Sequence, residues 1–420
     1  MKDKLLTISI AAYNVEKYLE KTLKSLICNN DLMQFLQVIV VDDGSCDKTS
    51  AIAQKYADMY PQIFLLIKKK NGGHGSTMNT ALQKANGKYF RMLDGDDWYD
   101  TVEFERYLWE LKEIDVDCVI TPYCQVYDVE TKNVDSHKLF EKREYSLLDL
   151  MSLYRNDKFS SVRAPELTIK TDILKKNGLH LTEKCMYTDT EYLLFVAIHA
   201  RTYIKFPYFV YQYRLGNVEQ SVGECGRRKY LSDIQKVIFS MLEMIQQKLT
   251  FVVNDSHKSF CYDCVINAIN FWCESLWYSA GKVDAEGLLT SFVDNLKVQY
   301  IDFMDYFKEN NCRFRWWKWL FSLKQVIEHE KCVIFGAGIY GERVLKYLMN
   351  IGHCQYVMTD NNSDLWNTKK DGCLIIPVVQ LLSLYGDSKI IIAVKNRPEE
   401  IENQLVSMGV AQDRILTFRE

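Results

Sequence analysis

Apolar and polar positions follow two different periods in the first part of the chain. Continuous apolar runs, typical of buried strands, lie at residues 5–13, 35–45, 63–69 and 88–94. Apolar residues recur every three or four positions, as on one face of a helix, at residues 15–27, 49–60, 76–85 and 102–114. A strand-like segment at 117–128 repeats the order. Alternating strands and helices predict an α/β fold with a mainly parallel sheet.

The period changes twice farther along the chain. Long helical and aromatic repeats lie at residues 231–249, 264–280 and 312–327. Residues 331–350 then have the pattern strand, glycine turn, helix, and further strand-like runs follow. We therefore predict three domains, which are an α/β domain at 1–225, a helical region at 226–327 and a small α/β domain at 328–420.

Composition narrows the class of protein. The chain of 420 residues is 48% hydrophobic and 25% charged, as in soluble globular proteins, and its formal net charge of -3 does not favour nucleic-acid binding. No apolar run has the length of a transmembrane helix, and the first run continues into a helical pattern, which favours a strand over a signal peptide. The 13 scattered cysteines favour reduced thiols, so we expect a cytoplasmic protein.

Polar residues gather where the predicted strands end. The segments are "AYN", "VDDGS" and "LDGDD", and they contribute Ala12, Tyr13, Asn14, Asp42, Asp43, Asp94, Gly95 and Asp96. The carboxyl ends of parallel strands meet at one edge of a sheet, where ligands bind. Four aspartates at residues 94–100 would repel one another unless solvent or a cation screened them. An exposed acidic turn is one interpretation, and we favour a site for Mg²⁺ or Mn²⁺, which prefer oxygen ligands.

Together these segments resemble glycosyltransferase family 2, the inverting enzymes with a GT-A fold, over roughly the first half of the chain. Residues 41–45 match the family's Val-Asp-Asp-Gly-Ser fully, and residues 94–96 match its Asp-x-Asp metal motif, although the first turn lacks the family's proline. "NGGHGSTMN" keeps Asn71, Gly72 and Asn79 of a third family segment, with Met78 where an arginine is frequent. The resemblance implies a nucleotide-sugar donor and a divalent cation.

The resemblance also suggests individual roles. Asp96 is the first candidate for the metal, Asp94 reaches either a ribose or the metal through water, and Asp100 is expected to cap a helix. The glycines let the backbone approach a ligand closely, and His74 either binds the donor or packs in the turn. We expect Lys68 to Lys70 to be solvated. The candidate donor-binding residues are Ala12, Tyr13, Asn14, Asp42, Asp43, Asn71, Gly72, Gly73, His74, Asn79, Asp94, Gly95, Asp96 and Arg214.

An inverting transfer needs a general base for the acceptor hydroxyl. The family supplies it from a Glu-Asp-x-x-Phe-like motif at the start of a helix, which "TDTEY" resembles, with Thr188 in place of the glutamate. We predict Asp189 as the base and Glu191 as the reserve. A compatible interpretation is that Thr188 or Asp189 caps the helix and Glu191 stabilises its positive end. Farther on, "YQYRLGNVEQSV" resembles a family segment that would direct Arg214 and Ser221 to the diphosphate, and a surface arginine is the alternative.

The segment "GAGIYG" follows a predicted strand and opens a helix. Its glycines Gly336, Gly338 and Gly341, with Asp360 after the next strand, have the pattern of a Rossmann-type nucleotide fingerprint. The segment resembles small nucleotide-binding-like domains appended to bacterial sugar-processing enzymes. Two interpretations stay open, a second nucleotide site or a retained fold without a ligand.

Two other segments have alternative interpretations. Residues 313–324 mix three tryptophans with arginines and lysines, which suits either a bilayer interface or a helix packed between domains. The pair Cys261 and Cys264 favours core packing over zinc, because no second pair accompanies it.

The predicted function is metal-dependent, inverting transfer of a hexose from a UDP-sugar to a hydroxyl of a glycan or lipid-linked saccharide. The expected setting is bacterial capsule or other surface polysaccharide synthesis, with peripheral contact at the inner face of the membrane. The alternatives are a catalytically silent nucleotide-binding or scaffold protein and an oxidoreductase that acts through the C-terminal Rossmann-like domain. The sequence does not specify the sugar, the acceptor or the oligomeric state.

Overall fold

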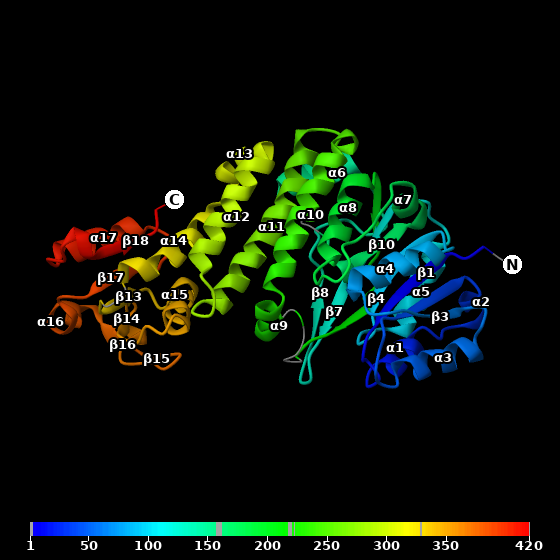
Figure 1. Cartoon of the computed structure of the whole chain (residues 1–420), viewed down its shortest axis with the longest axis horizontal. Helices are drawn as coiled ribbons and strands as arrows, with labels where there is room; N and C mark the ends of the chain where they lie inside the picture. The colour runs from blue at the N-terminus through cyan, green and yellow to red at the C-terminus, as the bar shows by residue number, and fades with distance from the viewer. Residues whose placement is uncertain (1–2, 157–161, 217–220, 222, 328–329, 420) are drawn as a thin grey trace. The chain divides into compact units, whose positions relative to one another are not determined.

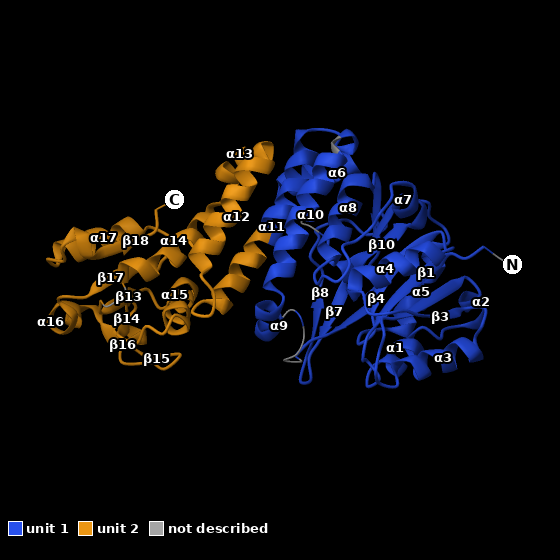
Figure 2. Cartoon of the chain, in the orientation of Figure 1, with its two compact units in different colours: residues 1–268 blue, residues 269–420 orange. Residues whose placement is uncertain are grey.

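The chain divides into two compact units, residues 1–268 and residues 269–420 (Figures 1 and 2). The computed structural model describes residues 3–156, 162–216, 221, 223–327 and 330–419. The boundary between the units falls inside the long helix α11, Asp255–Ser279, so the predicted helical region contributes to both. The limits of the three predicted domains stay a prediction.

An eight-stranded sheet forms the centre of the first unit, with the strand order β3-β2-β1-β4-β10-β6-β11-β9. The first four strands in this order are parallel, and β10 is antiparallel to both of its neighbours, β4 and β6. The strands are β1 (Leu6–Ala12), β2 (Leu36–Asp42), β3 (Phe64–Lys68), β4 (Tyr89–Asp94), β6 (Cys118–Ile120), β9 (Glu144–Ser146), β10 (Leu167–Lys170) and β11 (Thr202–Lys205).

Helices cover both faces of this sheet, which explains the near-continuous apolar runs of its strands. One core lies under α1 (Leu19–Ser25), α2 (Asn30–Met33), α3 (Thr49–Met59) and α5 (Thr101–Leu111). The core on the other face lies under α4 (Gly73–Lys84), α6 (Leu147–Arg155), α7 (Thr171–Lys176) and α8 (Asp189–His199). Helices α9 (Glu224–Lys229) and α10 (Leu231–Gln247) follow, and α10 packs on α8.

A second, four-stranded sheet has the order β5-β12-β7-β8. Its strands are β5 (Trp98–Tyr99), β7 (Tyr123–Val126), β8 (Thr131–Val134) and β12 (Tyr211–Arg214). Our prediction of one strand at residues 117–128 was wrong, because the segment divides at Pro122 into β6 and β7, which belong to different sheets. Proline has no N–H for a sheet ladder, so a strand break there has a physical cause.

The second unit combines helices with a six-stranded sheet of order β15-β16-β14-β13-β17-β18. Its strands are β13 (Cys332–Phe335), β14 (Tyr356–Asp360), β15 (Lys369–Lys370), β16 (Cys373–Pro377), β17 (Lys389–Ile392) and β18 (Ile415–Thr417). Its helices are α12 (Ala285–Gln299), α13 (Ile301–Asn310), α14 (Cys312–Ile327), α15 (Ile339–Asn350), α16 (Leu381–Tyr385) and α17 (Pro398–Ser407). The five strands from β16 to β18 are parallel, and their order is that of doubly wound folds. The Rossmann-like domain stays a prediction.

Two of the three tryptophans of α14 are core residues of the second unit. Trp316 is 5% exposed and Trp317 is 0% exposed. Trp316 packs edge-on against Tyr340 of α15, and the guanidinium of Arg343 lies 5.6 Å from the centre of the Trp317 ring. Trp316 and Trp317 are therefore not available for insertion into a bilayer, which favours the interpretation of a packed helix, and peripheral contact with a membrane stays a prediction.

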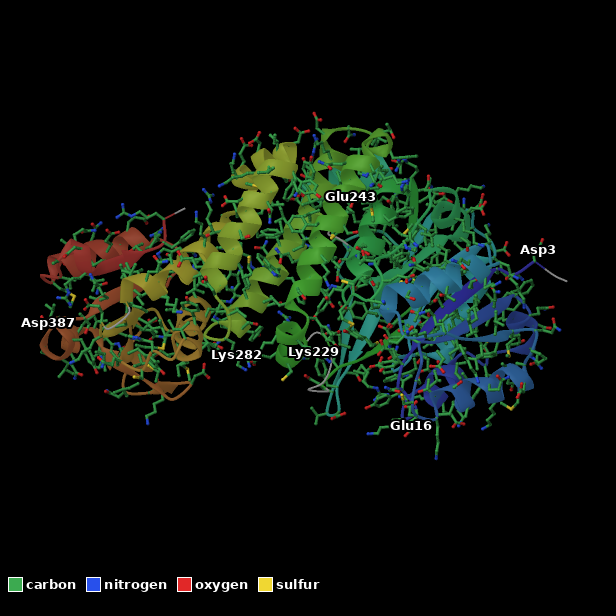
Figure 3. The ribbon with its side chains drawn as sticks, viewed as in Figure 1. Asp3, Glu16, Lys229, Glu243, Lys282 and Asp387 are labelled. Atoms are coloured by element: carbon green, nitrogen blue, oxygen red, sulfur yellow. The ribbon has the colours of Figure 1, made fainter. Side chains whose placement is uncertain are left out.

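Charged side chains such as Lys229 and Glu243 are exposed at the surface of the first unit (Figure 3). Across the described ranges, no helix is both long enough and apolar enough to span a bilayer.

Candidate active site

The three polar segments meet at the carboxyl edge of the large sheet. Ala12 of β1 pairs in register with Asp42 of β2, and Ala11 pairs with Asp94 of β4. Parallel pairing of β1 between β2 and β4 therefore brings the ends of all three strands together, as the alternation of strands and helices predicted.

The loops after β1 and β2 bind each other. Asn14, in a left-handed conformation with φ of 53°, donates its backbone N–H to Ser45 Oγ at 3.0 Å, and its side-chain oxygen accepts from Cys46 N at 2.9 Å. Asp42 is buried and accepts from Ser45 N at 2.9 Å, which closes the turn. Tyr13 is 50% exposed, so its ring is available to a ligand at this edge.

Asp43 anchors the glycine segment. Its carboxylate is 3% exposed and accepts from Gly72 N at 2.9 Å, from Gly73 N at 2.8 Å and from Lys69 Nζ at 2.8 Å. These amides begin α4, so the negative charge also lies at the positive end of that helix. The donor-binding roles predicted for Asp43, Gly72 and Gly73 do not fit this arrangement, because the groups already bind one another. Lys69 is likewise paired rather than solvated.

The remaining glycines of this segment allow close packing within the chain. Gly73 has a φ of +81°, and a Cβ at Gly75 would lie 2.3 Å from the carbonyl oxygen of Thr182. Asn79 is 7% exposed and binds the Leu181 backbone twice, at 2.9 Å in each direction. Asn79 therefore ties α4 to the segment before α8 instead of facing a donor, whereas Asn71 is exposed beside the Asp43 anchor.

Asp97 is the structural member of the acidic loop. Its carboxylate is 1% exposed and accepts from the Tyr211 hydroxyl and from Arg214 N, each at 2.7 Å. Burial raises the pKa of Asp97 well above its usual range, and Asp94 and Asp96 add to the effect. The preceding Gly95 donates to Ala11 O at 3.1 Å, and a Cβ there would lie 2.8 Å from the same oxygen.

Asp94 and Asp96 remain for a ligand. The Asp94 side chain is 47% exposed at the end of β4. Burial, followed by the proximity of Asp94, raises the pKa of Asp96 to about 6. In the described part of the chain, no side chain forms a hydrogen bond with the Asp96 carboxylate. Two carboxylates with poorly compensated charge fit a divalent cation that also takes phosphate oxygens, which is how Mg²⁺ is commonly bound.

The protein alone does not offer a complete set of metal ligands. Over the residues that the structure describes, no three His, Cys, Asp or Glu side chains gather as a metal-binding group. Asp94 and Asp96 would therefore hold a cation only together with oxygens of a bound donor, and the assignment of Mn²⁺ or Mg²⁺ stays a prediction.

Arg214 lies beside the acidic loop. Its Nε donates to Asp96 O at 3.0 Å, and its guanidinium lies 4.7 Å from the centre of the Tyr18 ring and 4.9 Å from that of Trp98. Sequence reasoning identified Arg214 but missed these aromatic partners and Tyr211, since no local pattern links them to it. Residues 217–220 and 222 of the same motif lie outside the described residues.

The predicted base lies at the first position of α8. Burial raises the pKa of Asp189 above its usual value, Asp94 adds to the effect and His74 opposes it. A carboxylate with a raised pKa is a better proton acceptor. His74 lies between these acids, with Nε2 3.5 Å from Asp94 Oδ1 and Nδ1 3.3 Å from Thr188 Oγ1.

Glu191 has a different position. It is 0% exposed, and its two oxygens accept from Thr182 N at 2.9 Å and from Thr182 Oγ1 at 2.6 Å. The reserve role as a base does not fit, because both oxygens are engaged with the segment before α8. Residues two positions apart point to different sides of a helix, which is a signal the sequence already contained.

The glycine turn of the second unit is closed by its own acid. Asp360 Oδ2 accepts from Ala337 N at 2.7 Å, and Oδ1 accepts from Asn362 N at 2.8 Å. Gly336 has a φ of +109°, and a Cβ at Gly341 would lie 1.8 Å from Gly336 O, whereas Gly338 has open space around it. These contacts account for Gly336, Gly341 and Asp360 without a ligand, and the second nucleotide site stays a prediction.

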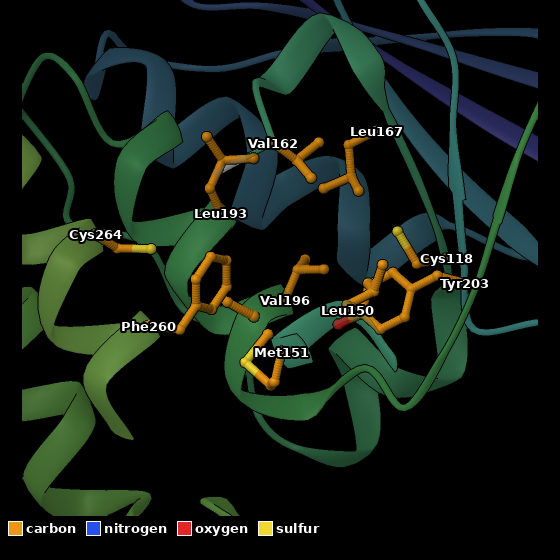
Figure 4. Close-up of a pocket in the computed structure, with 11 residues that line it drawn as sticks. Cys118, Leu150, Met151, Val162, Leu167, Leu193, Val196, Tyr203, Phe260 and Cys264 are labelled. Atoms are coloured by element: carbon orange, nitrogen blue, oxygen red, sulfur yellow. The ribbon is translucent and has the colours of Figure 1, made fainter. Parts of the chain in front are cut away.

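A small apolar cavity of about 30 Å³ lies in the core of the first unit (Figure 4). Side chains of β6, α6, α8 and α11 line it, including Cys118, Met151, Val196, Phe260 and Cys264. No predicted site residue lines it. Cys261, three positions earlier, is buried, and Cys264 is half-buried against the same core. The Cys261–Cys264 pair therefore packs in the core, as predicted.

Comparisons with known proteins identify the first region. The profile described as glycosyl transferase family 2 matches residues 7–165. The chain carries a glycosyltransferase family 2 domain. A second profile, described as C2185-like, N-terminal, matches residues 328–416. The predicted family is thus confirmed, whereas the predicted character of the C-terminal domain is not.

Several curated proteins are similar to this family 2 domain. The putative glycosyltransferase EpsH of Bacillus subtilis is 32% identical over 32% of this chain and 38% of its own length. The minor teichoic acid biosynthesis protein GgaB of Bacillus subtilis is 35% identical over 28% of this chain and 13% of its own. Chondroitin synthase of Escherichia coli is 36% identical over 28% and 17%. The chain therefore matches well under half of the length of each of these relatives.

Among solved structures, residues 1–349 of Staphylococcus aureus TarS are similar to this chain with a TM-score of 0.47 and 18% identity. The similarity covers 67% of this chain and 82% of that chain.

Proposed function

We propose that the family 2 domain transfers a hexose, with inversion, from a UDP-sugar to a hydroxyl of a glycan or lipid-linked saccharide. One observation carries the proposal. Asp94, at the end of β4, and Asp189, at the start of α8, both lie near His74 at the carboxyl edge of one sheet, and Asp96 lies near Asp94 in the loop that follows β4. Acids for a donor phosphate site and an acid for a base are therefore close together.

Asp94 and Asp96 would hold Mn²⁺ or Mg²⁺ together with the donor diphosphate. A bound cation there would neutralise the negative charge that develops on the leaving phosphate. Tyr13 and Asn71 are exposed at the same edge and are the proposed contacts for the nucleoside, while Arg214 supplies positive charge next to the acidic loop. Asp97, Asp43 and Asn79 support these residues from within the protein.

Asp189 is the proposed base that removes the proton of the acceptor hydroxyl. The raised pKa of this carboxyl supports the role, because a general base works best when its pKa lies close to the pH of the reaction. A single displacement with one base requires no covalent intermediate, so the configuration of the sugar inverts.

The proposed setting is bacterial surface polysaccharide synthesis on the cytoplasmic side. The names of two similar proteins support a polymer as the product, since one is a teichoic acid biosynthesis protein and another is a chondroitin synthase. The uridine nucleotide rests on the resemblance of "VDDGS" and "LDGDD" to the family's donor motifs.

A screen of nucleotide sugars tests this proposal. The full chain is incubated with each UDP-sugar and with GDP-mannose as a non-uridine comparison, with Mn²⁺ or with excess chelator, and release of the nucleoside diphosphate is measured. Cation-dependent release of UDP from at least one donor is expected. No release and no UDP binding would contradict the proposal and favour a scaffold role.

A further inference from the structure

His74 connects two parts of the site that lie far apart in the sequence. Its Nε2 faces the Asp94 carboxylate at the end of β4, and its Nδ1 faces the Thr188 hydroxyl, 114 residues away. Thr188 directly precedes Asp189, the first residue of α8. One imidazole ring therefore spans the distance between the proposed cation site and the proposed base.

Thr188 uses its hydroxyl in an unusual way for its position. A threonine before a helix usually accepts a hydrogen bond from an amide of the first turn, which is worth about 1 kcal/mol. Thr188 is 0% exposed and makes no such side-chain bond to α8. Its nearest recorded side-chain partner is His74 instead. The compatible interpretation of Thr188 as a side-chain cap was therefore wrong.

The direction of these contacts follows from the groups. A carboxylate only accepts, so the ring nitrogen that faces Asp94 carries a proton. In the neutral ring the other nitrogen accepts, and the Thr188 hydroxyl can donate to it. The two contacts then support each other in a single orientation of the ring.

The backbone around His74 is held firmly on both sides. Asp43 binds the amides of Gly72 and Gly73, directly before His74. Gly75, directly after it, packs against Thr182 so closely that no side chain would fit. A ring on such a fixed support transmits a change at Asp94 to Thr188 better than a ring on a free loop would.

We propose that His74 is a positioning residue, which couples the Asp94 end of the donor site to the placement of Asp189. The inference rests on the proposed function, since it gives Asp94 and Asp189 their roles. With donor and cation at Asp94, the ring orientation is fixed, Thr188 is held, and the start of α8 keeps Asp189 within reach of the acceptor hydroxyl.

The test uses the full chain and two variants that break the same contact from opposite sides. Thr188→Val keeps the shape of the side chain and removes the hydroxyl. His74→Gln keeps an amide near the position of Nε2 and removes Nδ1. Thr190→Val is the matched control, because the Thr190 hydroxyl lies at the same helix start but donates to Tyr187 O at 2.7 Å.

For each variant, kcat and KM are measured with the best UDP-sugar of the screen, and UDP affinity is measured by calorimetry with Mn²⁺. Both variants should lower kcat about tenfold, while KM and UDP affinity stay within about twofold. The double variant should be no slower than the slower single variant, because both changes remove one contact. A merely structural contact would lower the melting temperature without this split between kcat and KM.

Three results would overturn the inference. If the wild-type chain turns over a UDP-sugar and Thr188→Val leaves kcat within twofold, His74 does not position the base, although the proposed function stands. The same conclusion follows if the losses of the two single variants multiply in the double variant. If the wild-type chain neither binds UDP with Mn²⁺ nor turns over any UDP-sugar, the proposed function and this inference both fail.

Discussion

The two units place similar groups at the carboxyl edges of their sheets, yet their acids are engaged differently. In the second unit, Asp360 is the acid at the strand end, and both of its oxygens accept from backbone amides of its own and the neighbouring loop. In the first unit, Asp43 and Asp97 likewise accept hydrogen bonds from backbone amides of the loops. Asp94 and Asp96 are two further carboxylates at this edge, and among the described residues they do not have this role. The sheet of the first unit therefore has carboxylates at its edge that the protein itself does not need for its loops. This edge is the better candidate for an active site.

The difference is also electrostatic. Asp96 is held near Asp94 in a partly buried position, and its pKa is raised to about 6. The charged form of Asp96 is therefore unfavourable in the free protein, and a bound cation would make it favourable. Perturbed groups of this kind are typical of functional sites. Asp360 needs no such ligand, because its backbone partners explain it.

The sharpest way to break this comparison is Asp96→Asn. We expect it to lower Mn²⁺-dependent turnover of the donor by at least about a hundredfold, since one of two carboxylates for the cation is removed. Asp100→Asn is the matched control in the same acidic run. Asp100 accepts from Val102 N and Glu103 N at 3.0 Å as a helix cap, which asparagine can also do. Equal turnover of the two variants would contradict a metal role for Asp96.

Asp189→Asn extends the comparison to the base. Transfer should fall by roughly 10²–10⁴-fold, the range for a positioned general base, while UDP affinity is retained. Glu191→Gln should instead lower the melting temperature, because one of its two contacts with Thr182 is lost. A loss of UDP affinity in Asp189→Asn with transfer intact would assign that residue to donor binding.

Asp360→Ala tests the other side of the comparison. We expect the free energy of unfolding of the second unit to fall by about 2 kcal/mol, because two backbone amides lose a charged acceptor. Chemical denaturation followed by tryptophan fluorescence measures the change, since Trp366 donates to Asp360 O at 2.6 Å and reports on this loop. An unchanged stability, together with binding of NAD⁺ by the wild-type chain, would favour a ligand role for Asp360.

The smallest effect is the pH dependence of stability due to Asp96. Its pKa is raised in the folded protein from 3.8 to about 6, so between those values the folded state binds more protons than the unfolded state. Stability is then lost as pH rises from about 4 to 6. We expect about 1 kcal/mol, because Asp96 is partly exposed and solvent screens its charge. The wild-type and Asp96→Asn unfolding curves, compared from pH 4 to 7, should differ by this slope, and saturating UDP with Mn²⁺ should remove it.

Much of the fold and the position of the site followed from the sequence. The periods of apolar residues located the strands, and parallel strands must bring their ends together, so the meeting of "AYN", "VDDGS" and "LDGDD" was predictable. The engagement of individual groups was not. Asp43 reaches amides 29 and 30 positions away, and Asp97 meets Tyr211 across 114 positions, through contacts that no local pattern encodes.

The tryptophans of α14 illustrate the same limit. Basic and aromatic residues in one helix are equally compatible with a bilayer surface and with a core that buries rings beside an arginine. Only the packing of α14 against α15 decides between them, and Trp317 is buried by that packing. Glu191 is the contrary case, because helical geometry alone separates it from Asp189.

Strand β10 bears on how such a gene can be divided. The match to the family profile ends at residue 165, while β10 begins at Leu167 and pairs with both β4 and β6. A recombination event at the similarity boundary would encode a product whose sheet lacks a middle strand, and which also lacks Asp189, Tyr211 and Arg214. A gene segment that encodes the complete sheet must therefore extend well beyond residue 165. Gene fusions that exchange this domain intact are expected to have their junctions after β12, rather than at the end of the profile match.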